Sequence, residues 1–177
     1  ETVARAIARY GLSNYVLDPV MVATSGDRLL DRDAEAAIID QLLPLASLVT
    51  PNLDEAKILT GIDIVDEKSM AAAAEQLVSR GAAAALVKGG HLGGPRMVDV
   101  LADGERTEAF GRERIGTTST HGTGCTLSAA ITAQLARGAA LGKAVTTSLD
   151  FVTRAIATAP GLGAGAGPLN HFAPVSQ

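Results

Sequence analysis

Residues 120–126, with the sequence T-H-G-T-G-C-T, have the composition of an anion-binding turn. An apolar-periodic segment follows them, so we expect the turn to open a helix. Glycines let the backbone approach a ligand closely, and the N–H groups of a first helical turn, together with the helix dipole, favour a bound phosphate. We therefore predict that Gly122, Thr123 and Gly124 hold a phosphate, or the charge that develops on a phosphoryl group in transfer. An ordinary glycine-rich turn capped by Thr123 is the alternative.

Cys125 is the only cysteine, and it falls in the first turn of this predicted helix. The positive end of a helix dipole stabilises a thiolate, so Cys125 could act as a base or a nucleophile. The alternative is a cysteine packed beneath the turn, because cysteine is among the residues most often buried. Its place at an anion site favours the reactive role.

An amide and a carboxylate follow the predicted strand at residues 48–50. Asn52 and Glu55 stand three residues apart in a first helical turn, where they could position a hydrated Mg²⁺. Helix capping is the alternative, because asparagine is a good N-cap and glutamate a good first-turn acid.

Two other predicted strands also end in residues that could bind a ligand. Lys88 ends the strand at 83–88 and is followed by two glycines, which leave room for a phosphate. Asp18 ends the strand at 15–17 and could join the metal or phosphate site, while Val20 could line a substrate pocket. A turn lysine and a strand-ending Asx turn are the alternatives.

These chemical groups converge if the strands are parallel. The carboxyl ends of parallel strands meet at one edge of a sheet, where α/β proteins bind ligands. We therefore expect Asp18, Asn52, Glu55 and Lys88 to open, with the turn at 122–125, onto one crevice.

Helical and strand patterns alternate along the chain, which predicts an α/β fold with a mostly parallel sheet flanked by helices. The segments at 97–102 and 107–110 predict a hairpin appended to that sheet. The predicted strands are residues 15–17, 48–50 and 83–88, and the predicted helices are residues 1–10, 34–42, 54–60, 70–78, 127–135 and 141–156. The glycine-rich stretch at 161–167 is predicted to be a loop.

Composition limits the class of protein. With 177 residues, 47% of them hydrophobic, we expect one domain over residues 1–177. A net charge of -4 argues against a nucleic-acid partner, and the absence of a long apolar run or signal segment argues against a membrane and favours the cytoplasm. One cysteine excludes an internal disulfide. Because the chain opens in a helix, we expect the N-terminal strands of such a fold to be missing.

Four motifs carry a resemblance to a known family. They are D-P-V-M-V at 18–22, T-P-N-L-D-E-A at 50–56, V-K-G-G-H at 87–91 and T-H-G-T-G-C-T-L-S-A-A-I at 120–131. Together they resemble the hydroxymethylpyrimidine and phosphomethylpyrimidine kinases of thiamine biosynthesis, in the ribokinase-like superfamily. The similarity runs from Glu1 to Phe172 and includes G-P-L-N-H at 167–171.

The resemblance implies a three-layer ribokinase-like fold and the use of ATP and Mg²⁺. It implies phosphorylation of 4-amino-5-hydroxymethyl-2-methylpyrimidine and then of its monophosphate, in a homodimer. Gly122, Thr123, Gly124 and the Cys125 amide would form the anion hole, and the Cys125 thiolate would be the base. By position, the resemblance further implies nucleotide-binding roles for Lys88, Thr120, Asn52 and Glu55, metal-binding roles for Asp18 and Glu55, and substrate contacts for Val20 and Cys125.

Three other functions remain open. One is a pyridoxal or pyridoxine kinase, which shares the superfamily fold. Another is a non-catalytic nucleotide-binding fragment, since the predicted N-terminal strands are missing. The third is a thiol hydrolase in which Cys125 is the nucleophile and His121 the base, which leaves Lys88 without a role.

Overall fold

Two units make up the chain in the computed structural model, Glu1–Arg112 and Glu113–Gln177. The structure describes residues 1–23, 27–90 and 93–175. His91, part of one of the family motifs, lies outside the described residues. The single domain over residues 1–177 stays a prediction.

Unit 1 is built of alternating helices and strands, as the sequence pattern predicts. Its elements are α1 (Thr2–Tyr10), β1 (Val16–Leu17), α2 (Arg32–Ala37), a π-helical turn (Ile38–Leu42), a 3-10 turn (Leu43–Leu45), β2 (Leu48–Val49), α3 (Leu53–Thr60), α4 (Glu67–Ser79), β3 (Ala85–Lys88), β4 (Arg96–Ala102) and β5 (Thr107–Glu113).

Local signals in the sequence explain where these helices begin and end. α1 ends at Gly11, whose φ of 58° is the left-handed conformation that glycine adopts without a steric penalty. α3 begins with a capping box formed by Asn52 and Glu55, and α4 with one formed by Asp66 and Ser69. The helix predicted at 34–42 is only partly confirmed, because its α-helical part ends at Ala37.

The strands form one sheet in the order β1-β2-β3-β4-β5. β1 pairs with β2 and β2 with β3 in parallel, whereas β3 and β4 are antiparallel, with Lys88 opposite Asp99. The turn between β4 and β5 is held by Asp103, whose carboxylate accepts the N–H groups of Glu105 and Arg106. The predicted α/β class, with a mostly parallel sheet and an appended hairpin, is confirmed.

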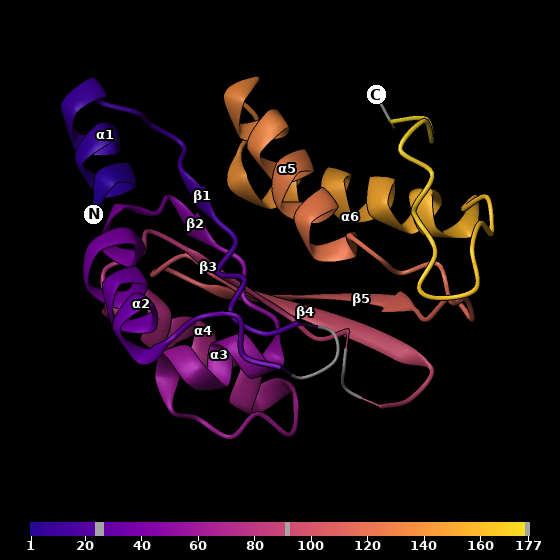
Figure 1. Ribbon diagram of the computed structural model, residues 1–177, viewed down its shortest axis with the longest axis horizontal. Coiled ribbons are helices and arrows are strands. Elements are labelled where there is room, and N and C mark those ends of the chain that lie inside the picture. The colour runs from indigo at the N-terminus through magenta and orange to yellow at the C-terminus, as the bar shows by residue number, and fades with distance from the viewer. Residues whose placement is uncertain (24–26, 91–92, 176–177) are drawn as a thin grey trace. The chain divides into compact units, whose positions relative to one another are not determined.

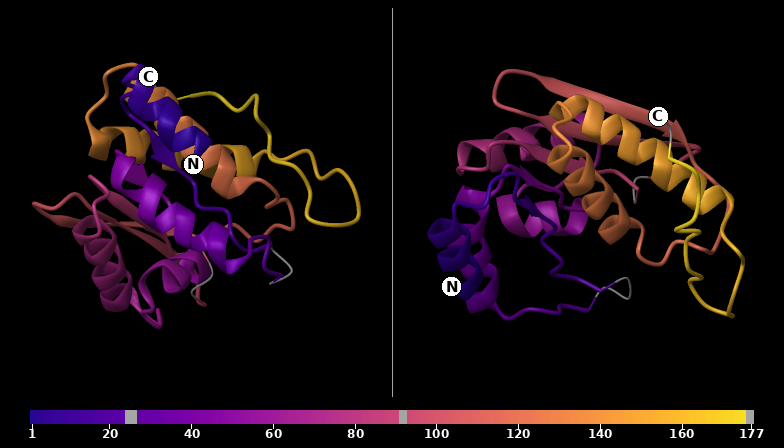
Figure 2. Two further views of the ribbon diagram at one scale, coloured as in Figure 1. Left: turned by 60° about the vertical axis from the view of Figure 1, so that its left-hand side comes forward. Right: turned by 90° about the horizontal axis from the view of Figure 1, so that it is seen from above.

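The core of unit 1 lies between the sheet and its helices. α3 and α4 lie together on one side of the sheet (Figure 1; Figure 2), and α4 packs on β3 and β4. The buried face of α4 consists of Met70, Ala73, Ala74 and Leu77, as its periodicity predicts. Its two alanines allow the helix to approach the strands closely.

Unit 2 contains α5 (Thr123–Ala136) and α6 (Leu141–Ala157), which pack against each other, followed by an irregular tail. The stretch at 161–167 has no regular structure, as predicted. Leu169 and Ala173 of the tail are buried against Ala155 of α6, and the Asn170 N–H donates to the Ala155 carbonyl at 3.0 Å. Within the described residues, no helix has the length and apolar character needed to cross a membrane.

Candidate active site

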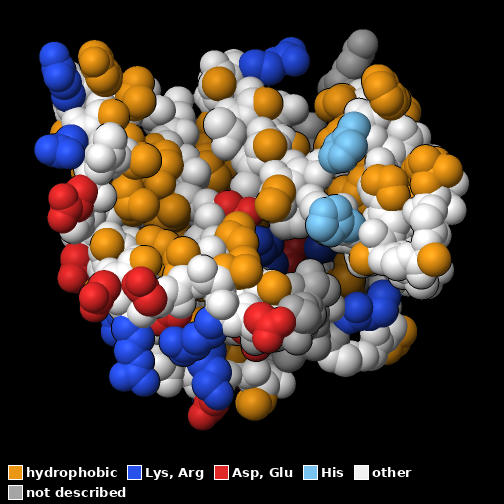
Figure 3. All heavy atoms as spheres, in the orientation of Figure 1, with side chains coloured by type: hydrophobic (Ala, Val, Ile, Leu, Met, Phe, Trp, Pro, Cys, Tyr) orange, Lys and Arg blue, Asp and Glu red, His pale blue; other side chains and the backbone are white. Residues whose placement is uncertain are grey.

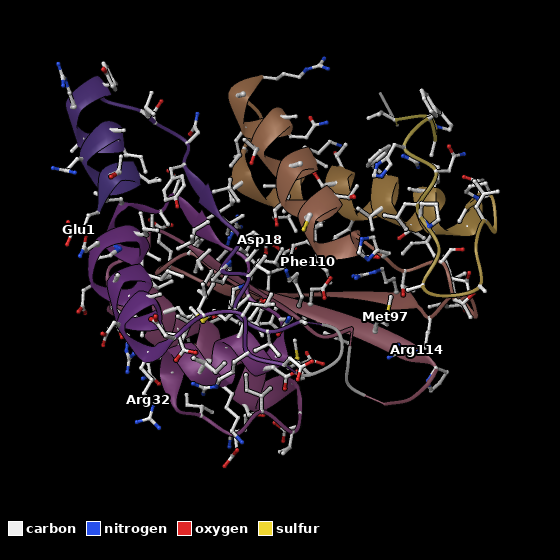
Figure 4. All side chains as sticks on the ribbon, in the orientation of Figure 1. Glu1, Asp18, Arg32, Met97, Phe110 and Arg114 are labelled. Atoms are coloured by element: carbon white, nitrogen blue, oxygen red, sulfur yellow. The ribbon has the colours of Figure 1, made fainter. Side chains whose placement is uncertain are left out.

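The ends of β1, β2 and β3 bring three polar side chains of unit 1 into contact. The Lys88 Nζ lies 2.9 Å from Asp18 Oδ1, and the Thr50 hydroxyl donates to the same oxygen at 3.2 Å. Backbone bonds hold the strand ends in place, since the Thr50 N–H donates to the Leu17 carbonyl and the Lys88 N–H to the Pro51 carbonyl. Asp18, which directly follows β1, is labelled in Figure 4.

Burial distinguishes Lys88 from an ordinary turn lysine. Its side chain is 15% exposed and that of Asp18 is 17% exposed, so the ion pair is largely shielded from water. Shielding strengthens electrostatic interactions, and an ammonium has three N–H donors, of which Asp18 takes one. Lys88 thus keeps N–H donors for a further acceptor, and its binding of a phosphate stays a prediction.

Asn52 and Glu55 cap α3 and also lie beside this cluster. The Asn52 N–H donates to Glu55 Oε2 at 2.8 Å, and the Glu55 N–H donates to Asn52 Oδ1 at 2.9 Å. Burial of Glu55, which is 3% exposed, raises the pKa of its carboxyl, while the hydrogen bond from Asn52 and the charge of Lys88 act in the opposite direction. Asn52 and Glu55 thus cap the helix, as the alternative proposed. The metal-binding role of Glu55 stays a prediction.

The donor set of unit 1 fits a magnesium ion that arrives with a nucleotide. No group of three or more His, Cys, Asp or Glu side chains in the described parts of the chain could hold a metal by itself. Mg²⁺ commonly binds through one or two protein carboxylates, with substrate phosphates and water as its other ligands. Asp18 and Glu55 could supply the carboxylates. A nearby cation would also offset the cost of burying the Glu55 charge.

The turn at the start of α5 has the geometry expected of an anion site. Gly122 is the N-cap and has a φ of 79°, a conformation that favours glycine. The Thr123 hydroxyl donates to the Thr120 carbonyl at 2.7 Å, and the Thr126 N–H donates to the Gly122 carbonyl at 2.9 Å. Thr123 thus braces the turn from inside the helix, and the alternative in which Thr123 is the cap is wrong.

The next two residues of α5 present the backbone donors. Gly124 and Cys125 lie in the first turn of α5. Their N–H groups have no hydrogen-bond partner within the helix, because the residues four positions earlier precede it. Cys125 is exposed, so the alternative of a cysteine packed beneath the turn is wrong. An open surface pocket of about 440 Å³ in unit 2 is lined by Cys125, Thr126, Ala129, Ala130, Phe151 and His171. The two described histidines, His121 and His171, are exposed and visible in Figure 3.

The motif at 167–171 forms backbone hydrogen bonds with the residues that lead into this turn. The His121 N–H donates to the Gly167 carbonyl at 3.1 Å, and the Gly167 N–H donates to the Thr118 carbonyl at 3.3 Å. A Cβ at Gly167 would lie 2.8 Å from the Ser119 hydroxyl, so only glycine allows so close an approach. The tail of unit 2 therefore fixes the backbone that leads into the predicted anion site.

The strand-end residues of unit 1 lie together as the sequence predicts, but two of their supports were not predicted. Thr50 binds Asp18, and Asp99, fully buried on β4, accepts the Gly89 N–H at 2.8 Å. A charged residue inside an otherwise apolar strand was the available signal for Asp99. Val20 is 45% exposed, and its substrate role stays a prediction. The convergence of the turn in unit 2 with the cluster in unit 1 also stays a prediction.

The strand-end cluster and the glycine-rich helix start together define an α/β protein with two groups suited to phosphate. Comparison with known proteins makes the class specific. The model of the family described as phosphomethylpyrimidine kinase matches residues 1–170, and the chain belongs to this family. The resemblance drawn from the four motifs is confirmed.

Two curated relatives and one solved structure show how far the similarity extends. The hydroxymethylpyrimidine/phosphomethylpyrimidine kinase of Rhizobium meliloti is 50% identical over 173 residues, which are 96% of this chain and 65% of that protein. The thiamine biosynthesis bifunctional protein ThiED of Geobacter sulfurreducens is 46% identical over 96% of this chain and 35% of its own length. The ADP complex of Bacillus subtilis pyridoxal kinase superposes with a TM-score of 0.88 at 38% identity, over 97% of this chain and 64% of that one. The chain thus spans about 65% of the Rhizobium meliloti relative.

Proposed function

We propose that this protein transfers the γ-phosphoryl group of ATP to 4-amino-5-hydroxymethyl-2-methylpyrimidine and then to its monophosphate, a reaction sequence of thiamine biosynthesis. The observation that carries the proposal is the shielded Lys88–Asp18 pair beside Glu55, at the strand ends of a chain that belongs to the phosphomethylpyrimidine kinase family. Two of its relatives are named for this chemistry and this pathway.

The residues divide into two groups by role. Lys88 would donate hydrogen bonds to the ATP phosphates, and Thr120 would also contact the nucleotide. Asp18 and Glu55 would bind Mg²⁺ through their carboxylates, and Asn52 would help to position it. When bound, Mg²⁺ neutralises phosphate charge and orients the transferring group. Glu55 stays oriented for this role because the capping box fixes its carboxylate.

Unit 2 would supply the anion hole and the base. The Gly124 and Cys125 amides, with Gly122 and Thr123 shaping the turn, would bind the oxygens of the transferring phosphoryl group. The Cys125 thiolate would accept the proton of the hydroxymethyl group as its oxygen forms a bond to the γ-phosphorus and ADP leaves. In the second transfer the acceptor is already an anion, so the base contributes less. Val20 would contact the pyrimidine ring.

The decisive assay measures phosphorylation of both pyrimidines by ATP in the presence of Mg²⁺. It is run on this chain, and on a chimera in which the unmatched third of the Rhizobium meliloti relative flanks the chain. We expect ADP to form with both acceptors in the chimera and to require Lys88. A chimera that binds ATP but phosphorylates neither pyrimidine would favour the non-catalytic nucleotide-binding alternative.

A pyridoxal kinase is the second candidate, because the structural relative bound to ADP is named for that activity and shares 38% identity with this chain. Competition between pyridoxal and hydroxymethylpyrimidine separates the two. Preference for pyridoxal, measured as kcat/KM, would overturn the proposed substrate while leaving phosphoryl transfer in place. A homodimer acting in the cytoplasm belongs to the same proposal, and sedimentation of the chimera tests the dimer.

A further inference from the structure

Asp99 is a buried carboxylate that the proposed chemistry does not use. It lies on β4 and is fully shielded from water. Its position in the register places it opposite Lys88, the last residue of β3. Removal of one partner from a buried ion pair is strongly destabilising, while a well-packed apolar pair of the same size is often as stable. Stability alone therefore gives a weak reason for a charge at this position.

Both oxygens of Asp99 have assigned partners. Oδ1 accepts the Gly89 N–H at 2.8 Å, and Oδ2 forms an ion pair with the Arg112 guanidinium of β5. The Gly89 N–H thus donates to a side chain, directly after the last residue of β3. An unsatisfied N–H buried at this position would be costly, so Asp99 fixes the path of the backbone directly after Lys88.

The glycine at this position is as constrained as the carboxylate. A Cβ on Gly89 would lie 1.8 Å from the Val98 carbonyl oxygen and 2.9 Å from the Met70 side chain. Gly89 therefore runs against the backbone of β4 at a distance that any larger residue would prevent. Close approach and the Asp99 hydrogen bond together hold residue 89 against the sheet.

We propose that Asp99, oriented by Arg112, is a positioning residue that sets the Lys88 ammonium and the Gly89 backbone for binding of a nucleotide polyphosphate. The inference rests on the proposed function. Lys88 is shared between Asp18 at 2.9 Å and the incoming phosphate, so a small shift of its backbone changes which of them it reaches. Asp99 acts on the nucleotide through Gly89 and does not contact the substrate.

The test replaces the charge and keeps the shape. In Asp99→Asn the amide can accept from Gly89 or from Arg112, but its NH₂ group then faces the other donor. We expect KM for ATP to rise roughly 10- to 100-fold, because small misplacements of a binding group have effects of this size, while KM for the pyrimidine stays unchanged. The double variant Asp99→Asn/Arg112→Gln offers the amide a matching acceptor, and we expect it to recover most of the ATP affinity.

Controls separate positioning from folding and from the proposed function itself. Asp63→Asn breaks the exposed Lys57–Asp63 pair and should leave KM for ATP unchanged. A loss of kcat and melting temperature in Asp99→Asn with KM for ATP unchanged would overturn the inference, as would failure of the double variant to recover affinity. The dissociation constant of a non-hydrolysable ATP analogue with Mg²⁺ is measured in parallel. Its change decides the inference even if neither pyrimidine is phosphorylated, an outcome that counts against the proposed function alone.

Discussion

Glu55 caps a helix, and in the proposed function it must also remain an anion beside a nucleotide. Burial raises its pKa above the usual value, which means that folding favours the neutral carboxyl over the carboxylate. In the absence of a ligand, the ionised form therefore costs stability once the pH exceeds the folded-state pKa. This cost is absent below the unfolded-state pKa, where the group is neutral in both states.

Glu55→Gln should separate these two demands. A glutamine keeps the hydrogen bond from Asn52 and has no charge to bury, so we expect the variant to melt at the same temperature or higher at pH 7. Mg-ATP-dependent phosphorylation should fall by ~100-fold or more, because a preorganised charged contact is lost. Thermal melts from pH 4 to pH 8, with turnover at pH 7, test this prediction. The prediction compares the melting temperature of the variant minus that of the parent at each pH. A smaller difference at pH 7 than at pH 4 would contradict it.

In the proposed mechanism, Cys125 is the residue on which the two phosphorylation steps differ most. Cys125→Ser keeps the backbone donors of the α5 turn but replaces the side chain that is the proposed base by a hydroxyl. We expect phosphorylation of the free alcohol to slow by ~100-fold, the scale of general-base catalysis, and that of the monophosphate to slow much less. Single-turnover rates with each acceptor measure this difference. Equal losses for both acceptors would exclude the base role.

At the level of elements, α4 gives a prediction that depends on pH and does not involve the site. Its N-cap, Asp66, accepts hydrogen bonds from the hydroxyl and the N–H of Ser69, which hold the pKa of this exposed carboxyl below its usual value. Because the folded-state pKa is the lower one, the stabilisation is present above the unfolded-state pKa and is lost as the pH falls through the folded-state value.

Asp66→Asn isolates this effect. Asparagine caps helices about as well as aspartate but does not titrate in this range. We expect the parent to melt above the variant at pH 6, and the difference to shrink as the pH falls below 4. Urea midpoints at several pH values measure the same trend. Parallel curves for the two proteins would show that the Asp66 charge contributes nothing to the cap.

The same elements show what could be predicted from the sequence and why. The capping box of Asn52 and Glu55 is local, so its spacing is visible in the chain. The contact of Lys88 with Asp18, 70 residues earlier, followed from one rule, that parallel strand ends meet at one edge. The hydrogen bond between Gly89 and Asp99 depends on the register of an antiparallel pair and on close backbone approach, and neither can be deduced from residue types.

At the level of the whole molecule, the two groups suited to phosphate lie in different units, Lys88 in unit 1 and the Gly122 turn in unit 2. If both bind one nucleotide, their contributions to affinity must depend on each other. If each binds its own anion, the contributions must add. Thermodynamic coupling distinguishes these cases without reference to how the units are arranged.

A double-mutant cycle on Lys88→Met and Gly122→Ala measures that coupling. Gly122→Ala strains the turn, since a residue with a side chain at a φ of 79° costs ~1–2 kcal/mol, and Lys88→Met removes the cation at nearly constant volume. We expect the two losses of affinity for a non-hydrolysable ATP analogue to deviate from additivity by about 0.5–3 kcal/mol, as for groups that share a partner. Gly116→Ala, at an exposed loop glycine with open space around it, serves as the control for Gly122. Additivity within about 0.5 kcal/mol would mean that the two groups bind separate anions, and the single crevice predicted from the strand ends would then be wrong.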